Sequence, residues 1–229
     1  MKVKVLTIFP ELFPGFLGVS LTGKALDEGK WSLETVNIRD YAFDKHGSVD
    51  DTPSGGGAGM IMRADVLGAA LKANYTNGRL INMSPRGTPL TQAKVHELSQ
   101  EENLTIICSR FEGIDERVLE AYGAEDISIG AYMLTGGEQA AMIMLEAIVR
   151  MLPGVLGNAE STLSESFEAD LLEYPQYTRP TFWEGREIPE ILISGHHQKI
   201  ADWRHLKSEE ITKVRRSDLW KKYLASKQN

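Results

Sequence analysis

Short apolar runs recur through the first 130 residues and are separated by more polar stretches. They lie at Val3–Phe9, Ser32–Ile38, Arg79–Met83, Leu104–Cys108 and, less clearly, Glu125–Ile129. Their length and their content of β-branched residues predict strands. Most of the intervening segments have the length of a helical crossover, and this favours a parallel α/β sheet.

The segments between these runs repeat apolar residues at helical spacing. The repeat is clear in Ala64–Asn74 and Asp115–Tyr122 and weak in Gln92–Gln100. Residues Glu138–Leu152 also read as one helix, but their apolar side chains run almost all the way round it. Such a helix must be covered on nearly every side, either by the protein's own core or by a second subunit.

The pattern changes after Pro153-Gly154. Residues Asn158–Glu168 are polar, rich in Ser and Glu and poor in apolar periodicity, which is typical of a linker or a mobile loop. Apolar residues return from about residue 187 onward at a spacing that predicts a small helical domain. The chain is therefore expected to have a large α/β part and a smaller helical part.

Composition adds bounds on the class of protein. With 229 residues, 42% of them hydrophobic and 25% charged, the chain is typical of a soluble globular protein. No signal peptide and no run of 18 apolar residues are recognised, so a cytoplasmic protein without membrane contact is expected. The single cysteine, Cys108, lies in an apolar run and is interpreted as a core residue rather than a reactive thiol.

The net charge of −7 conceals a division along the chain. Residues 195–229 carry nine Lys or Arg and four acidic side chains, whereas the preceding part is strongly acidic. A basic segment on an acidic body suggests phosphate binding. On charge alone, a solvated helical tail is the slightly favoured alternative.

Two segments have the glycine spacing of a phosphate-binding loop, and both fail on chemistry. Gly18–Ala25 ends in alanine where a hydroxyl must hold magnesium, and Gly55–Gly59 follows a polar segment instead of a strand. His196 and His197 are adjacent, which is poor geometry for one metal ion, and no further ligands complete a set. No metal site is predicted.

Glycine-rich turns follow three of the predicted strands. They are Ser84–Gly87, Ser109–Gly113 and Gly130–Gly137. Parallel α/β proteins bind ligands at the carboxyl ends of their strands, and glycine lets the backbone approach a ligand closely. Any one of these turns is more simply a plain connection, but their joint occurrence favours a ligand site.

Several blocks of this sequence resemble one known family. The likeness covers essentially the whole chain, in the same order, and the family is that of the bacterial tRNA (guanine-N1)-methyltransferases, of the knotted SPOUT class. The blocks that carry it are Val49–Asp51, Gly55–Met60, Arg110–Arg117, Ser128–Gly130, Gly136–Glu138, Pro153–Gly157 and Tyr177–Pro180. The resemblance implies a deep trefoil knot, which periodicity does not reveal and which general folding rules disfavour.

The resemblance also implies an organisation and an activity. Residues 1–157 would form the knotted domain that binds S-adenosylmethionine, residues 158–176 a mobile linker with an active-site loop, and residues 177–229 a helical tRNA-binding domain. The enzyme would methylate N1 of the guanosine 3′ of the anticodon (position 37) when a guanosine precedes it. A homodimer with a shared active site, binding to the anticodon stem-loop of tRNA, and a candidate dependence on Mg²⁺ complete the expectation.

Site residues follow from the resemblance by position. The cofactor is expected to contact Ser84, Pro85, Gly87, Ser109, Glu112, Gly113, Ile129, Gly130, Ala131, Tyr132, Met133, Leu134, Gly136 and Gly137. Ser109 stands where the family usually has glycine, and Ala131 where it usually has an acidic residue. Contacts to tRNA are expected from Asp50, Arg110, Glu173, His197 and Arg204.

The catalytic pair implied by the resemblance is Glu165 and Arg150. Guanine N1 carries a proton, so a general base must remove it while a donor stabilises charge on O6. Glu165 takes the place of an aspartate that precedes a Ser-Phe pair in the family, and Arg150 matches a catalytic arginine. From the residues alone, Arg150 would be an ion-pair partner of Glu146 on the same helix. A methyltransferase for another nucleotide and a non-catalytic RNA-binding protein are the alternatives.

Overall fold

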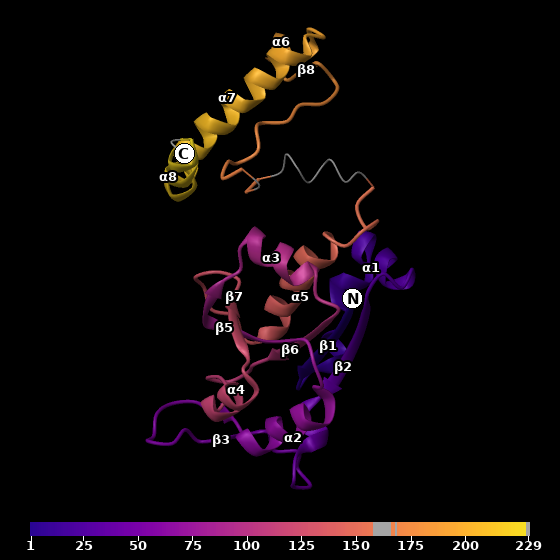
Figure 1. Ribbon diagram of the computed structural model, residues 1–229, viewed down its shortest axis with the longest axis vertical. Coiled ribbons are helices and arrows are strands. Elements are labelled where there is room, and N and C mark those ends of the chain that lie inside the picture. The colour runs from indigo at the N-terminus through magenta and orange to yellow at the C-terminus, as the bar shows by residue number, and fades with distance from the viewer. Residues whose placement is uncertain (158–165, 168, 228–229) are drawn as a thin grey trace. The chain divides into compact units, whose positions relative to one another are not determined.

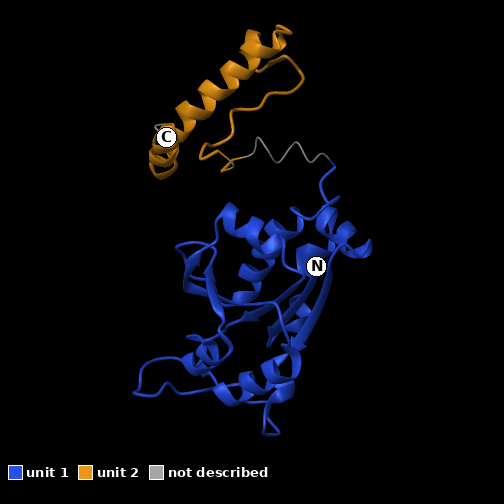
Figure 2. Ribbon diagram, in the orientation of Figure 1, with its two compact units in different colours: residues 1–157 blue, residues 158–229 orange. Residues whose placement is uncertain are grey.

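The chain forms two compact units, residues 1–157 and residues 158–229 (Figure 1, Figure 2). The computed structural model describes residues 1–157, 166–167 and 169–227. The five strands and the helices that pack on them belong to the first unit, and the second unit contains three helices and a short hairpin in its described part.

A five-stranded sheet forms the centre of the first unit. Its strands are β1 (Lys2–Thr7), β2 (Ser32–Asn37), β5 (Arg79–Pro89), β6 (Asn103–Cys108) and β7 (Glu125–Ser128). They lie in the order β2-β1-β6-β5-β7, and every neighbouring pair is parallel. The predicted parallel α/β sheet is therefore confirmed.

Helices cover both faces of this sheet (Figure 1). The helices α1 (Ser20–Asp27), α3 (Gln92–Ser99) and α5 (Gly137–Val149) contribute to one apolar core. The helices α2 (Ala64–Asn74) and α4 (Glu116–Tyr122) contribute to a second core on the opposite face. Successive side chains of a strand point to opposite faces, so β1, β5 and β6 each contribute buried residues to both cores.

The helix α5 is packed mainly against its own chain. Most of its residues are buried in the first core, including Met144, Leu145 and Ile148, each with no exposed surface. Ile143 is the exception among the large apolar side chains and is 45% exposed. The chain's own core thus covers most sides of this apolar helix, and one apolar side chain, Ile143, remains exposed.

The helix α1 was not predicted, and it explains one of the glycine patterns. A side chain on Gly23 would lie 2.4 Å from the carbonyl carbon of Gly18, so the helix and the preceding turn can approach only because glycine stands here. Trp31, which is buried, donates a hydrogen bond from Nε1 to the carbonyl of Thr22 at 3.0 Å. The glycine spacing therefore serves helix packing.

Short elements complete the first unit. Three 3₁₀ helices span Pro10–Leu12, Gly15–Gly18 and Ile38–Tyr41. A two-stranded antiparallel hairpin joins β3 (Asp50–Asp51) to β4 (Ile61–Met62). The glycine-rich segment that was rejected as a dinucleotide loop forms the connection of this hairpin.

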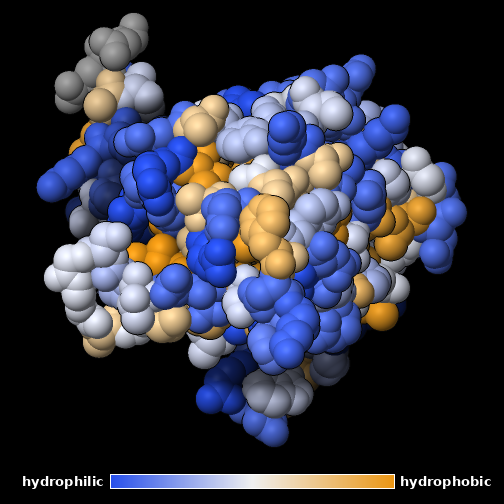
Figure 3. Space-filling model, turned by 90° about the horizontal axis from the view of Figure 1, so that it is seen from below, coloured by the Kyte–Doolittle hydropathy of each residue, from blue (hydrophilic) through white to orange (hydrophobic). Residues whose placement is uncertain are grey.

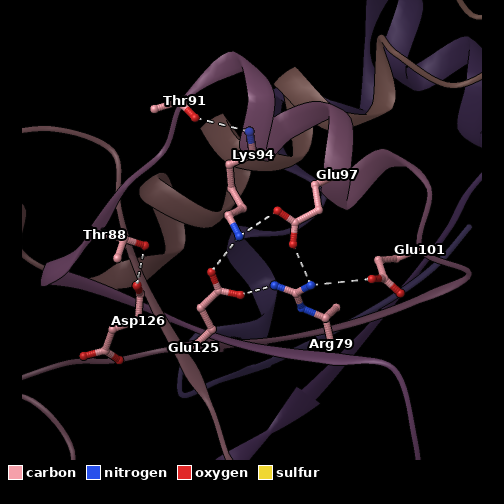
Figure 4. Close-up of polar contacts among 8 residues, drawn as sticks. All are labelled: Arg79, Thr88, Thr91, Lys94, Glu97, Glu101, Glu125 and Asp126. Atoms are coloured by element: carbon pink, nitrogen blue, oxygen red, sulfur yellow. Dashed lines mark hydrogen bonds and ion pairs between the residues drawn. The ribbon is translucent and has the colours of Figure 1, made fainter.

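A cluster of charged side chains joins the amino ends of β5 and β7 to α3 (Figure 4). This strand-start cluster consists of Arg79, Lys94, Glu97, Glu101 and Glu125. Arg79 pairs with Glu97 at 2.7 Å, Lys94 pairs with Glu125 at 3.0 Å, and Arg79 also pairs with Glu125. Hydrogen bonds from Lys94 and then Arg79 lower the pKa of Glu97. Burial raises the pKa of Glu125, but hydrogen bonds from Arg79 and Lys94 outweigh it, and the net shift is downward.

The described part of the second unit buries few apolar residues. It contains the hairpin β8 (Phe182–Trp183) and β9 (Arg186–Glu187), followed by α6 (Glu190–Ile193), α7 (His197–Arg215) and α8 (Ser217–Ser226). Helices therefore occupy the region where the sequence predicted them. Across the described parts of the chain, no helix is both long enough and apolar enough to span a bilayer.

Candidate active site

A cavity of about 890 Å³ opens beside the middle of β5 and at the carboxyl ends of β6 and β7. It lies in the first unit, where the irregular part of β5 and the turns after β6 and β7 meet the segment between β3 and α2. Seen from the side of α2 and α4, apolar patches lie among polar residues on this face (Figure 3). The volume falls within the usual range for small-molecule sites.

Most of the residues predicted to bind the cofactor line this cavity. They are Ser84, Pro85, Ser109, Glu112, Gly113, Ile129, Gly130, Tyr132, Met133, Leu134, Gly136 and Gly137. Parallel strands bring their carboxyl ends to one edge, so turns separated by up to about fifty residues of chain meet there. The three glycine-rich segments thus share one cavity, but Ser84–Gly87 is not the predicted turn after a strand, because it lies inside β5 where the register with β7 shifts.

Gly87 and Ala131 do not belong to the lining. A side chain on Gly87 would lie 2.5 Å from the backbone nitrogen of Ile127, so glycine at this position lets β5 pass close to β7. Ala131 lies between two lining residues, Gly130 and Tyr132. Gly87 therefore shapes the backbone beside the cavity, whereas Ala131 is only absent from its lining.

The stretches 50–60 and 109–113 lie against each other. The backbone N–H of Glu112 donates to the carbonyl of Met60, and that of Met62 donates to the carbonyl of Gly113, both at 2.9 Å. A side chain on Gly59 would lie 2.4 Å from Cγ of Glu112. The glycine-rich connection therefore packs against Glu112, a cavity residue, and helps to fix its position.

Asn82 is a cavity residue that the sequence reasoning missed. It is 3% exposed, lines the cavity, and donates from Nδ2 to Oδ1 of Asp126 at 2.8 Å. Its Oδ1 is the one buried side-chain acceptor without a partner in the part of the chain that the structure describes. A buried polar atom without a partner is costly, so a ligand donor would stabilise it. The signal in the sequence was a polar residue inside an apolar strand.

Arg110 does not line the cavity, although it was expected to contact the tRNA. Its side chain is 16% exposed, and Nε donates to Oε2 of Glu138 at 2.9 Å. The guanidinium also lies over the ring of Phe9, 4.5 Å from the centroid. Glu138 is a second residue that sequence reasoning missed, and an acidic residue in the first turn of an apolar helix was its signal.

Asp50 also stays outside the lining, whereas its neighbour Asp51 takes part in it. Asp50 pairs with Met62 across the β3-β4 hairpin. Successive residues of a strand face opposite sides, which separates these two carboxylates.

Arg150 follows the last residue of α5, and its backbone N–H donates to the carbonyl of Glu146. The cavity contacts the other end of this helix, at Gly137 and Ala140. A rise of 1.5 Å per residue places the backbone of Arg150 about 20 Å from that of Gly137. The chain's own Arg150 and its cavity therefore lie at opposite ends of α5. Glu165, the predicted base, lies outside the described residues.

Three predicted tRNA contacts belong to the second unit. The carboxylate of Glu173 accepts a hydrogen bond from Gln176. His197 is the exposed first residue of α7. The guanidinium of Arg204 lies 4.9 Å from the centroid of the Tyr174 ring. They thus come from the connection before the helices and from one face of α7.

Two further expectations concern chemistry that the site could hold. Among the described residues, no group of three or more His, Cys, Asp or Glu is arranged to hold a metal ion. Cys108 is fully buried, and burial raises its pKa well above the usual value of a thiol. Its interpretation as a core residue is confirmed.

Comparison with known proteins places the chain in a family. The profile of the family described as tRNA (Guanine-1)-methyltransferase TrmD matches residues 1–222. The tRNA (guanine-N(1)-)-methyltransferase of Bartonella tribocorum is 58% identical over 227 residues, covering 99% of this chain and 98% of the relative. That of Rhodospirillum rubrum is 56% identical over 228 residues, covering 99% and 95%. The chain therefore belongs to the tRNA (guanine-1)-methyltransferase family.

Proposed function

We propose that this protein transfers a methyl group from S-adenosylmethionine to N1 of a guanosine in tRNA, at the position 3′ of the anticodon when another guanosine precedes it. The observation that carries the proposal is the single cavity shared by three glycine-containing segments: the irregular middle of β5 and the turns that follow β6 and β7. Family membership supports the reaction, since the relatives are named for methyl transfer to guanine N1 of tRNA.

The residues of the cavity fit an adenosyl ligand. The volume of about 890 Å³ suits a nucleoside with an amino-acid chain. The turns offer backbone donors and acceptors, and Asn82 offers a buried acceptor that needs a donor. When bound, S-adenosylmethionine supplies an electrophilic methyl group with a good leaving group.

The protein must then activate guanine N1, which is protonated at neutral pH. Glu165 is proposed as the general base that removes this proton, and the guanidinium of Arg150 as the cation that stabilises negative charge on O6. Replacing Glu165 by glutamine removes the base and keeps the shape. Turnover should fall by about 100-fold or more, with the affinity for S-adenosylmethionine unchanged. Near-normal turnover would assign the base to another residue.

The proposal includes a homodimer with shared active sites. Its support is the distance of about 20 Å between Arg150 and the cavity end of α5, together with the exposed Ile143. A second copy would bring its own Arg150 to the cavity of the first. The same proposal includes a knotted path of the chain and a cytoplasmic location. It also includes tRNA binding by the second unit through Glu173, His197 and Arg204. In the first unit, the proposed tRNA contacts are Asp50 and Arg110.

Mixing two inactive variants tests the shared site. Arg150→Ala removes the proposed cation, and Gly130→Trp fills the cavity with a bulky side chain. If each site takes its cavity from one chain and Arg150 from the other, mixed dimers regain one complete site and activity returns. If each chain supplies its own Arg150, mixing restores nothing.

A tRNA assay tests the reaction itself. The purified protein should methylate a transcript with guanosine 3′ of the anticodon, and replacing this base by adenosine should abolish transfer. Mapping the modified nucleotide in a digest identifies the target. Equal methylation of both transcripts would indicate another nucleotide, and calorimetric binding of S-adenosylmethionine without transfer would indicate a non-catalytic RNA-binding protein.

No metal-ligand set is evident among the described residues, so no step is assigned to Mg²⁺. The effect of Mg²⁺ on methyl transfer is measured by adding a chelator.

A further inference from the structure

Glu138 is a carboxylate with no exposed surface, placed in the first turn of α5. Both of its oxygens have a partner. Oε1 accepts a hydrogen bond from the hydroxyl of Thr7 at 2.7 Å, and Oε2 accepts one from Nε of Arg110 at 2.9 Å. Thr7 is itself fully buried at the end of β1, and its hydroxyl oxygen accepts the backbone N–H of Phe9 at 3.0 Å. Burying a charge so completely is costly unless every partner is in place.

The guanidinium of Arg110 is fixed from several directions. The ring of Phe9 lies 4.5 Å away on one side, and Nη1 donates to the carbonyl of Thr135 at 3.3 Å. A side chain on Gly136 would lie 2.2 Å from Nε of Arg110, so this arginine rests directly against the backbone of Gly136. Glu138 determines which way Arg110 points, and Arg110 in turn contacts Thr135 and Gly136.

These contacts fall at one end of the segment that lines the cavity. Residues 129–137 all line the cavity except Ala131, and Thr135 and Gly136 lie near the end of this segment. The backbone N–H of Gly137 donates to the carbonyl of Ser109 at 2.9 Å, which ties the same end to the turn after β6. The position of this wall therefore depends on a side chain that does not touch the cavity.

We infer that Glu138, oriented by Thr7, is a positioning residue for the cofactor wall. It fixes the guanidinium of Arg110, and Arg110 fixes the Thr135–Gly136 end of the 129–136 segment. This inference rests on the proposed function, in which that segment contacts S-adenosylmethionine. Glu138 contributes to cofactor affinity through Arg110, in addition to its contribution to stability.

The test uses the full-length protein and three substitutions. Glu138→Gln keeps the size and removes the charge, Thr7→Val keeps the shape and removes the hydroxyl, and Arg110→Lys keeps the charge and removes the planar guanidinium. Arg79→Ala is the matched control, because it breaks a charged cluster of the same sheet that lies outside the cavity. Calorimetry with S-adenosylmethionine, well below the melting temperature of each variant, gives the dissociation constant of folded protein.

We expect Glu138→Gln to raise this dissociation constant about tenfold, and Thr7→Val to raise it less. Combining Glu138→Gln with Arg110→Lys should weaken binding no more than the worse single change, because both act through one contact. Arg79→Ala should leave the constant unchanged. If Glu138→Gln binds with wild-type affinity, or if the two effects multiply, the inference is overturned.

Hydrogen exchange in the ligand-free protein gives a readout that does not depend on the cofactor. Amides of residues 129–137 should exchange faster in Glu138→Gln than in wild type, while Arg79→Ala leaves them unchanged. Unchanged exchange in this segment would also overturn the inference. If Glu138→Gln does not fold, the dissociation constant and the hydrogen exchange are both measured on Thr7→Val instead. Failure of the proposed function is seen separately, as wild-type protein that neither binds S-adenosylmethionine nor methylates tRNA.

Discussion

The sheet of the first unit carries ionic contacts at both ends, and they differ in burial and in setting. At the carboxyl ends, Glu138 has no exposed surface and Arg110 is 16% exposed. At the amino ends, the side chains of the strand-start cluster are between 23% and 46% exposed. The buried pair adjoins the wall of the cavity, whereas no member of the strand-start cluster lines it.

This difference separates two uses of the same chemistry. A solvent-exposed ion pair contributes little to the stability of the fold, because water screens both charges whether or not the two side chains are in contact. A buried pair also adds little net stability, but each partner depends on the other, because a lone buried charge is costly. Because each partner needs the other, a buried pair holds both side chains in one position. The Glu138–Arg110 pair therefore suits a place beside the cavity, where the position of side chains matters for a ligand.

The largest effect is expected from Glu138→Ala. This change leaves the partly buried guanidinium of Arg110 without its carboxylate partner and opens a void beside Thr7. The free energy of unfolding should fall by about 3–5 kcal/mol. Urea denaturation followed by circular dichroism measures it. A loss no greater than that of Arg79→Ala would remove the distinction between the two ends of the sheet.

A second test displaces Arg110 without touching its charge. Gly136 is in an extended conformation that alanine also adopts, so Gly136→Ala acts through its new methyl group, which would meet Arg110. Methyl transfer, as kcat/KM, should fall by about 100-fold, because small displacements near a site are costly. Gly68→Ala in α2 is the control, since a side chain there has open space. Equal kcat/KM in the two variants would show that Arg110 tolerates displacement.

A smaller effect is expected at the amino ends. Arg79→Ala removes the centre of the strand-start cluster, and the free energy of unfolding should fall by about 1 kcal/mol. The loss should shrink at high salt, because ions screen partly exposed pairs. Methyl transfer by the folded variant should match wild type. A reduced kcat in fully folded Arg79→Ala would show that the amino ends of the strands also contribute to the reaction.

The smallest effect concerns pH. The pKa values of Glu97 and Glu125 are lowered in the folded protein by Lys94 and Arg79. Their contribution to stability is therefore present above the ordinary glutamate pKa of 4.5 and is lost as the pH falls through the lowered values. Wild type should lose stability over this acidic range more steeply than Arg79→Ala, as measured by urea denaturation at a series of pH values. Parallel pH dependences would show that the cluster does not hold these carboxylates in their charged form.

The sequence predicted most of the first unit because its elements are regular. The helix expected at Ala64–Asn74 has these bounds in the structure, and the five strands overlap the apolar runs, although β5 continues to Pro89 through the turn predicted at Ser84–Gly87. The helix α1 was missed because it is short and buries Thr22 and Gly23, which are not typical core residues, and its packing depends on close contact between Gly18 and Gly23. Glycine that permits such contact is indistinguishable in sequence from glycine in a turn.

The candidate site was predicted in part for a similar reason. Glycine-rich turns after strands indicated the cavity, because parallel strands bring such turns together. The partner of Arg110 could not be predicted, since Glu138 lies 28 residues away and many carboxylates were equally available. Asn82 was visible as a polar residue in an apolar strand, but only burial showed that its acceptor lacks a partner.

By itself, the sequence determined the parallel α/β class, the position of two glycine-rich turns that line the cavity and, through its motifs, the family. These properties depend on local periodicity and on blocks of consecutive residues. The tertiary structure alone decided that Gly59 packs against Glu112, that Glu138 and Thr7 orient Arg110, and that Arg150 stands at the far end of α5 from the cavity. Such relations join residues distant in the chain, and their energies depend on burial and distance, which exist only after the chain has folded.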